Sequence, residues 1–278
     1  MFKGFYTVAS GMIAQQRRTE LLTNNISNVR TPGFKEDQAT IRSFPDMLLS
    51  RINATTIPTE KGLNHMYANR VGTLTNGVYM QETLANYSQG QLLETELATD
   101  MALINRGMPV NADGVEGTVL FRLQHPDGGE AYTRNGNFTV DANGYLVNAQ
   151  GLYVLSDTNA RMQVGSDDFT LDGEGMIYTA NNQQVGRVGV AYSDNPELLV
   201  KRDDGLLRLE GNANLPTAYG AQGVTFGLQQ KYIEGSNVDS GRAMTELMTA
   251  YRAFEANQKV LQAYDRSMEK AVNEIGKV

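Results

Sequence analysis

The chain has 278 residues, of which 41% are hydrophobic and 20% charged, and its formal net charge is -7. These proportions are typical of a globular protein with one or two domains. The mean hydropathy is -0.38 and no run of about 18 apolar residues occurs, which argues against a membrane-spanning protein. The absence of cysteine excludes disulfides, thiolate metal sites and cysteine nucleophiles.

The charges are distributed unevenly along the chain. Residues 1–35 hold five basic residues and one acidic residue, whereas residues 237–278 hold six of each, so the middle carries the negative charge. No basic stripe with interleaved aromatic residues is present, and we therefore expect no nucleic-acid partner. The apolar stretch 4–14 is interrupted by polar residues and lacks a cleavage site, so we expect no cleaved signal peptide.

The N-terminal residues step by three and four along one helix face. These positions are apolar at both ends of the segment and polar in the middle: Phe2, Phe5, Ala9, Met12, Gln16, Thr19, Thr23 and Ile26. This period predicts a helix that packs lengthwise on another helix. Helical character ends near Asn28, and Thr31-Pro32-Gly33 predicts a turn, because proline fixes φ and disfavours helix at the preceding residue.

The middle of the chain changes from a mixed pattern to a β pattern. Residues 44–49, with Pro45 near their start, predict a short helix, and residues 52–78 predict an extended loop or small flap. From residue 91, Val119, Phe121 and Leu123 alternate with polar residues. Residues 138–140 and 145–147 flank Asp141-Ala142-Asn143-Gly144, which predicts a hairpin. Many short strands with glycine turns indicate a sandwich or irregular barrel.

A second helical stripe occupies the C-terminus. Steps of three and four give Met244, Leu247, Tyr251, Phe254, Gln258, Leu261, Asp265, Met268, Val272 and Ile275. A helix over about 238–276 would be roughly 58 Å long at 1.5 Å per residue, and such a stripe requires a partner helix. The simplest partner is the N-terminal helix, followed by copies of the same chain. We interpret the apolar positions of both stripes, together with Gln16 and Gln258, as an assembly seam.

The predicted fold class is therefore α+β, with long terminal helices that pair as a coiled-coil domain and an inserted all-β domain. Residues 1–35 and 237–278 would form the helical domain, residues 36–90 an extended linker or flap, and residues 91–236 the β-rich domain. Gln16 and Gln258 are polar points in the seam. They either fix its register at a cost in stability or face solvent.

Three segments resemble bacterial flagellar rod and hook proteins. Residues 21–35 (LLTNNISNVRTPGFK) resemble the N-terminal signature of that family, and residues 132–147 (YTRNGNFTVDANGYLV) resemble its β-domain motif. Residues 235–239 (GSNVD) and 250–260 (AYRAFEANQKV) resemble its C-terminal signature, with Tyr251 and Phe254 as mild departures. Met108-Pro109 replaces a usual aromatic pair. The chain has no room for the additional outer domain of hook proteins, so the resemblance is to rod proteins of the distal-rod type or a close paralogue.

The resemblance implies a structural polymer subunit. It would assemble with copies of itself and with other rod and hook subunits, and it would reach the basal body through the flagellar type III export apparatus. It would then lie outside the cytoplasm, across the periplasmic and cell-wall region. A hook-type protein, or another extracellular coiled-coil scaffold or adhesin, is the alternative.

The residues after the first helix form a predicted junction: Asn24, Asn25, Asn28, Pro32, Gly33 and Phe34. The asparagines would either cap the helix and hold the turn or simply stop the helix. Phe34 would either insert between neighbouring subunits or make a local core contact.

Little in the sequence indicates catalysis. His65 and His125 lie in separate loop-like stretches without a second metal ligand, and no serine-nucleophile or phosphate-binding signature occurs. The hairpin accounts for the resemblance of Asp141-x-Asn143-Gly144 to the start of a calcium loop. The acidic residues Asp167, Asp168, Asp172 and Glu174 form either a weak metal site or a solvated edge. We expect no enzymatic activity, no cofactor and no small-molecule substrate.

Overall fold

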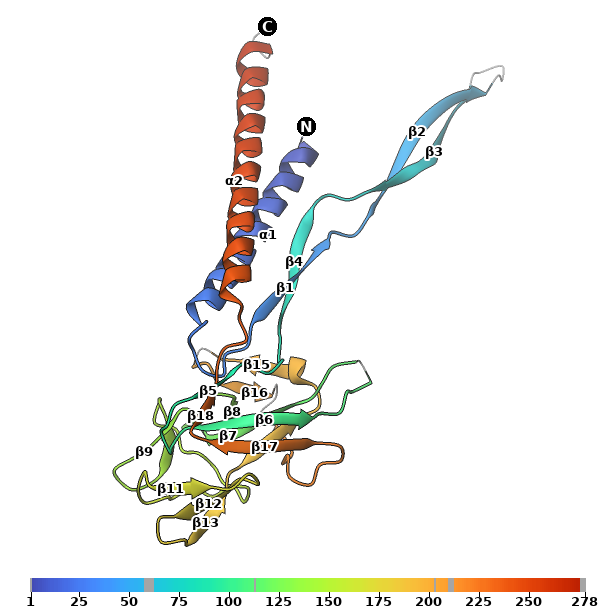
Figure 1. Cartoon of the computed structure of the whole chain (residues 1–278). Coiled ribbons are helices and arrows are strands. Elements are labelled where there is room, and N and C mark those ends of the chain that lie inside the picture. Colours follow the sequence, from blue (N-terminus) through green and yellow to red (C-terminus); the bar gives the residue numbers. More distant parts are fainter. Residues whose placement is uncertain (1, 58–62, 113, 203, 210–212, 276–278) are drawn as a thin grey trace. The chain divides into compact units, whose positions relative to one another are not determined.

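The computed structural model describes residues 2–57, 63–112, 114–202, 204–209 and 213–275 (Figure 1). The chain divides into two compact units. The helical unit contains residues 1–24, 38–84 and 241–278, and the β unit contains residues 25–37 and 85–240. This division assigns residues 25–37 to the β unit and residues 38–84 to the helical unit, and the chain passes between the units four times.

Two long helices dominate the helical unit. Helix α1 spans Phe2–Ser27 and helix α2 spans Ser240–Lys270, followed by a π-helical turn at Ala271–Ile275. Both predicted helices are therefore confirmed, within one to two residues of their expected starts and ends. Among the described residues, no helix is long and apolar enough to span a bilayer.

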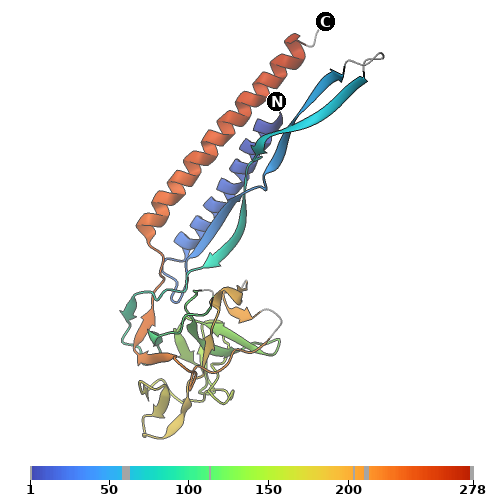
Figure 2. The ribbon, with the colours of Figure 1, turned by 90° about the vertical axis from the view of Figure 1, so that its right-hand side faces the viewer.

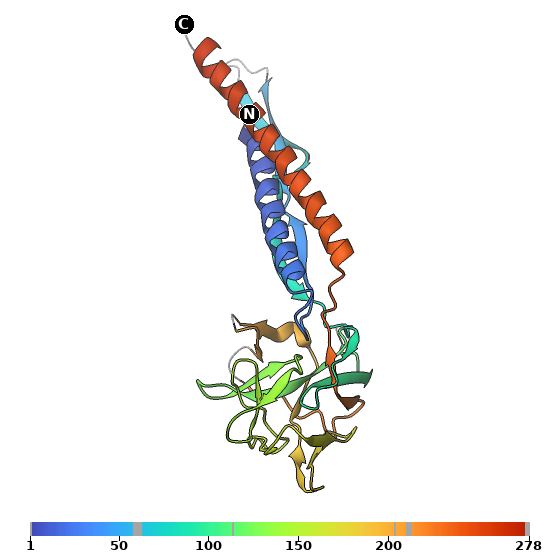
Figure 3. The same ribbon diagram turned by 60° about the vertical axis from the view of Figure 1, so that its left-hand side comes forward.

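The two helices lie side by side and antiparallel (Figures 1 and 3). A Cβ added at Gly4 would meet the Tyr264 hydroxyl, and one at Gly11 would lie 3.3 Å from the Asn257 amide nitrogen. Further along, Arg18 Nη2 forms a 3.1 Å ion pair with Glu246 Oε2. The two glycines are seven residues apart, as are Tyr264 and Asn257, so small residues on one helix face larger ones on the other at a heptad interval.

A β ribbon completes the helical unit. Strand β1 (Asp37–Ser43) pairs with β4 (Val78–Ala85), and β2 (Met47–Ile57) pairs antiparallel with β3 (Leu63–Leu74). The predicted helix over 44–49 is therefore wrong. Residues 52–78, predicted as an extended loop or small flap, form most of a paired ribbon and not an unpaired loop. Met47 lies opposite Leu74 and Phe44 stacks on Tyr79 at 5.1 Å, so cross-strand contacts favour the extended conformation. The loop between β2 and β3, residues 58–62, lies outside the described residues.

The described strands of the β unit form five antiparallel sheets, not one sandwich or barrel. A five-stranded sheet has the order β14-β7-β8-β16-β15, formed by Val190–Ser193, Thr118–Gln124, Glu130–Thr133, Leu207–Leu209 and Leu199–Lys201. A 3₁₀ turn (η1), Pro196–Leu198, precedes β15. The pairs β6–β17 and β5–β18 are formed by Met101–Gly107 with Thr225–Gln230 and Leu92–Glu94 with Tyr232–Glu234. The predicted β-rich middle is confirmed.

The remaining sheets of the β unit are hairpins. Strands β9 (Phe138–Val140) and β10 (Leu146–Asn148) pair as predicted, with Asp141 Oδ1 accepting from Asn143 N and Tyr145 N in the turn. Strands β11, β12 and β13 span Phe169–Leu171, Met176–Thr179 and Gln184–Arg187.

The core of the β unit lies on both faces of β7. The side chains of Phe121 and Leu123 belong to the main cluster, with Phe138, Leu146 and Ile177. Leu120 belongs to a second cluster with Tyr132, Ala191, Leu199 and Leu215. Both faces of β7 are therefore buried, and six of its seven residues are removed from solvent.

Candidate functional site: a buried junction and an exposed helix face

Three residues about a hundred positions apart form a buried ionic cluster in the β unit. Glu234 Oε1 lies 2.5 Å from Lys35 Nζ, and Glu234 Oε2 lies 2.5 Å from Arg134 Nε. All three side chains are almost fully removed from solvent. Because Lys35 and Arg134 belong to two of the signature segments and Glu234 directly precedes the third, the cluster brings the three segments together.

The other polar atoms of this cluster are satisfied as well. Arg134 donates at 2.5–3.0 Å to the Val119 carbonyl, the Leu103 carbonyl and Asn105 Oδ1. Lys35 Nζ donates to the Ser88 carbonyl at 2.7 Å, and Glu234 Oε1 accepts from Gly90 N at 2.9 Å. Buried ions are tolerated only with such complete hydrogen bonding, so the cluster requires six separate chain segments to occupy fixed positions.

The electrostatics of the cluster favour an ionised carboxylate. Burial alone would raise the pKa of Glu234. The positive charges of Arg134 and Lys35 outweigh that effect and hold its pKa below the ordinary value of 4.5. Burial lowers the pKa of Lys35 below 10.5, with only partial compensation from Glu234.

The predicted junction residues lie next to this cluster. Asn25 is fully buried. Its side-chain amide forms two hydrogen bonds with the backbone of Asp37, donating to the carbonyl at 2.8 Å and accepting from the N–H at 3.1 Å. Asn28 Oδ1 accepts from the Thr31 hydroxyl, while Asn24 is exposed. The Asn25 side chain therefore joins the two ends of the segment 25–37, so its role goes beyond ending helix α1.

Gly33 has a conformation and a contact that exclude a side chain. Its φ is +69° and its N–H donates to the Glu234 carbonyl at 2.7 Å. A Cβ there would collide with backbone atoms of Arg134 and Asn135. Pro32, just before it, is half-buried.

Phe34 makes a local contact. Its ring is buried and lies 3.8 Å from Lys201 Nζ. Of the two roles expected for Phe34, the structure therefore favours the local core contact.

Sequence analysis missed the ionic cluster and the role of Asn237. Asn237 Oδ1 accepts from Glu36 N at 2.7 Å, and its Nδ2 donates to the Asn86 carbonyl at 2.7 Å. One feature of the sequence could have indicated the cluster. Each of the three signature segments contains or adjoins a charged residue with no assigned role: Lys35, Arg134 and Glu234.

Helix α2 presents two apolar faces, whereas the sequence predicted one seam. The alternate seam positions Leu247, Phe254, Leu261 and Met268 are half-buried, and Ala243 and Ala250 beside them are buried. The other alternate positions are exposed: Met244, Tyr251, Gln258 and Val272. On α1, Phe5, Ala9, Met12 and Ile26 are half-buried and Gln16 is exposed. The side chains of Phe2 and Ile275 lie outside the described residues.

The exposed face of α2 forms one wall of a groove against α1. The groove has a volume of about 260 Å³ and is lined by Thr19, Thr23, Met244, Leu247, Met248, Tyr251 and Arg252. Most of its lining is apolar, which suits a side chain of another protein better than a polar substrate.

Comparison with known proteins identifies the three signature segments as parts of one family. Residues 5–35 match the model described as flagella basal body rod protein, and residues 114–226 match the flagellar hook protein FlgE/F/G D1 domain. Residues 229–274 match the flagellar basal body rod FlgEFG protein C-terminal model.

Relatives match over the whole length of the chain. It is 40% identical to the flagellar hook-basal body complex protein FlhO of Bacillus subtilis, over 100% of both chains. The chain belongs to the flagellar basal-body rod protein family. It is also 30% identical to the flagellar basal-body rod protein FlgG of Borreliella burgdorferi, over 96% of this chain and 97% of that protein. With the FlgG of Bacillus subtilis it shares 27% identity over 98% of this chain and 99% of the relative.

The family membership gives the ionic cluster a meaning. Lys35, Arg134 and Glu234 each fall in a different one of the three matched regions, so the cluster joins the parts of the rod protein that define the family. The family is one of structural rod proteins, and this chain is a rod subunit that assembles with other rod and hook subunits.

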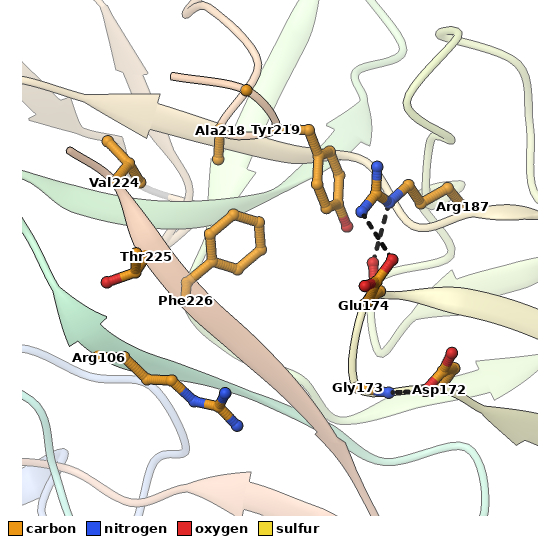
Figure 4. A pocket seen from close by; sticks show the side chains of 11 residues that line it. Arg106, Asp172, Gly173, Glu174, Arg187, Ala218, Tyr219, Val224, Thr225 and Phe226 are labelled. Atoms are coloured by element: carbon orange, nitrogen blue, oxygen red, sulfur yellow. Dashed lines mark hydrogen bonds and ion pairs between the residues drawn. The ribbon is translucent and has the colours of Figure 1, made fainter. Parts of the chain in front are cut away.

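One hollow of this rod protein lies in the β unit (Figure 4). It has a volume of about 530 Å³, and the rings of Tyr219 and Phe226 lie between Arg106 and Arg187. Arg187 Nε donates to the Glu174 carbonyl at 2.9 Å, and its guanidinium lies 3.7 Å from the Tyr219 ring centroid. The charged side chains of Arg106 and Glu174 are exposed, and nothing here selects a ligand.

The remaining residues considered for chemistry make ordinary surface contacts. His125 Nδ1 accepts from Asp127 N at 3.1 Å, and the side chain of His65 lies outside the described residues. Asp167, Asp168, Asp172 and Glu174 are exposed. In the described part of the chain, no three His, Asp or Glu side chains are placed to hold a metal ion.

Proposed function

We propose that this rod protein self-assembles through its terminal helices, which form the coiled-coil inner core of an axle that transmits torque to the hook. The observation that carries the proposal is the second apolar face of α2. Met244, Met248 and Tyr251 are 53%, 51% and 55% exposed on successive turns of a helix whose other face is already packed. A contiguous exposed apolar patch of this kind marks an interaction surface.

The energetics suit a polymer. Full burial of a large apolar side chain stabilises by about 1.5–3 kcal/mol, so completing the burial of three half-exposed ones supplies several kcal/mol per contact. Every subunit carries the same face, and the gain is therefore repeated along the polymer.

The proposal includes a route and a location. The subunit leaves the cytoplasm through the flagellar type III export apparatus without a cleaved signal peptide, and the basic N-terminal segment 1–35 is the part read by that apparatus. It then lies in the basal body across the periplasmic and cell-wall region. Support comes from its rod-protein relatives and from the concentration of basic residues at the N-terminus.

Substitutions on the two sides of α2 test the assembly role. Tyr251→Asp places a carboxylate on the exposed apolar face, and burying it would carry a large desolvation cost. Thr249→Asp is the matched control, because Thr249 is exposed on a different side of the same helix. The expected result is that cells with Tyr251→Asp lack rods that contain the protein and do not swim, whereas Thr249→Asp cells swim normally.

Two further readouts make this test decisive. Circular dichroism of both purified variants checks that the fold is retained. Normal rods and swimming with Tyr251→Asp would show that this face is not an assembly surface. A stable closed trimer of the wild-type chain in solution would favour the alternative of a coiled-coil scaffold.

A further inference from the structure

The base of the β2–β3 ribbon carries apolar side chains that the described part of the helical unit leaves exposed. Met47 and Leu48 are 56% and 60% exposed, and Leu49 beside them is also exposed. We call Asp46, Met47, Leu48 and Leu49 the ridge. A two-stranded ribbon is only marginally stable in water by itself, so the ridge requires a covering surface.

The groove between α1 and α2, lined by Thr19, Thr23, Met244, Leu247, Met248, Tyr251 and Arg252, has the opposite shape. An apolar cavity of about 150 Å³ already accepts benzene, and the groove of about 260 Å³ therefore accommodates a large apolar side chain. The helical unit thus carries both an uncovered apolar projection and an unfilled apolar groove.

The ridge of a chain does not reach the groove of the same chain. The ribbon contacts α1 at Ser10, whose hydroxyl accepts from Val78 N at 3.4 Å, and Phe44 N donates to the Gly77 carbonyl at that point. The groove begins at Thr19, about 14 Å further along the helix at 1.5 Å per residue. Figures 1 and 2 show that β2 and β3 continue toward the opposite end of α1.

The charges at the edges of the two surfaces are complementary. Asp46 is exposed at the start of the ridge, and its Oδ1 accepts a hydrogen bond from the Thr75 hydroxyl at 2.7 Å. Arg252 is exposed at the rim of the groove and forms no ion pair within the described part of the chain. A carboxylate on one surface and a guanidinium on the other favour one docked orientation.

We propose that the ridge of one copy docks in the groove of a second copy, with Asp46 of the first paired with Arg252 of the second. The proposal rests on the proposed self-assembly of the rod protein and names the surfaces that meet. Each copy donates a ridge and offers a groove, so the contact is heterologous and does not close on itself. Repetition of such a contact generates an open helical polymer.

Cysteine cross-linking in cells tests the proposal, because the chain contains no cysteine of its own. Cells co-produce one copy with Leu48→Cys and another with Met248→Cys, and basal bodies are isolated after mild oxidation. A disulfide requires the two Cα atoms to lie within about 7 Å. We expect a disulfide-linked dimer, and at least about tenfold less of it when Thr249→Cys replaces Met248→Cys.

The outcomes separate the docking proposal from the rod function. Basal bodies that contain both variants, with no more dimer for Met248→Cys than for Thr249→Cys, would overturn the docking and leave the rod function intact. Absence of the wild-type protein from isolated basal bodies would overturn both.

Charge reversal provides an independent measurement on the purified full chain. Asp46→Arg alone and Arg252→Asp alone each place like charges at the contact, and sedimentation should show self-association weakened about tenfold or more. An equimolar mixture of the two variants restores opposite charges at every ridge and groove, and association should recover to near the wild-type level. A mixture that associates no better than the separate variants would contradict the proposed pairing, and so would single variants that associate like the wild type.

Discussion

Glu234→Gln isolates the contribution of the buried ionic cluster. The substitution retains the size of the side chain and removes its charge, which leaves the Lys35 ammonium and the Arg134 guanidinium in the same buried space. Glu234 is the only anion within 4 Å of either cation in the described structure. We expect the β unit to lose stability and the segment 25–37 to detach first, because Lys35 is one of its buried anchors.

The expected loss follows from the burial of all three groups. Their side chains are 6% exposed or less, and removal of one partner from a buried ion pair costs about 3–5 kcal/mol. Adding Lys35→Met to Glu234→Gln removes one of the two unpaired cations. The double variant should therefore be destabilised by less than the sum of the single variants, with a coupling energy of about 1–3 kcal/mol.

Hydrogen exchange at the amides of β7 and β8 measures this effect within one unit of a two-unit chain, where a single unfolding transition cannot be assumed. Glu174→Gln is the matched control. Glu174 is 83% exposed and lies 3.8 Å from Arg187, and such surface pairs contribute about 0.2–1 kcal/mol. A loss for Glu234→Gln as small as that for Glu174→Gln would refute the idea that the cluster holds the signature segments together.

Three other predictions follow from the same structure. Because the folded-state pKa of Glu234 is below 4.5, its stabilisation is present above that pH and is lost as the pH falls below it. Hydrogen exchange should show a smaller acid destabilisation of the β unit in Glu234→Gln. Gly151→Ala should cost about 1–2 kcal/mol for its φ of +81° alone. Gly33→Ala should cost clearly more in the same assay because of its backbone collision, and equal losses would contradict this. Gly11→Leu should separate α1 from α2 at Asn257 and speed amide exchange in both helices, whereas unchanged exchange would exclude close packing there.

The terminal helices and the central hairpin could be predicted because local pattern determines them. The stepping of apolar residues gave both helices with ends close to those observed. The sequence Asp141-Ala142-Asn143-Gly144 specifies a tight turn, and the observed φ of +79° at Gly144 is the one that glycine supplies without strain. In each case the determining contacts lie within a few residues in the chain.

The ribbon and the ionic cluster could not be predicted because distant residues determine them. Residues 44–49 contain proline followed by helix-compatible apolar residues, but pairing with residues 72–74 makes residues 47–49 the start of a strand. Likewise, Lys35 resembles an ordinary surface lysine in the sequence, and only the folded chain brings Glu234, 199 positions further on, beside it. Tertiary contacts override local preference in both places.

The single predicted seam on α2 became two faces for a geometric reason. Steps of three and four describe two series of positions, each seven residues apart, which lie on adjacent sides of the helix. Leu247, Phe254 and Leu261 belong to the series that packs within the chain, and Met244 and Tyr251 belong to the series that stays exposed. One partner helix covers one of the two series, so a stripe in which both are apolar calls for a second partner. An apolar stripe that is wider than the partner helix of the same chain can cover therefore predicts, from the sequence, a subunit that completes its packing only in an assembly.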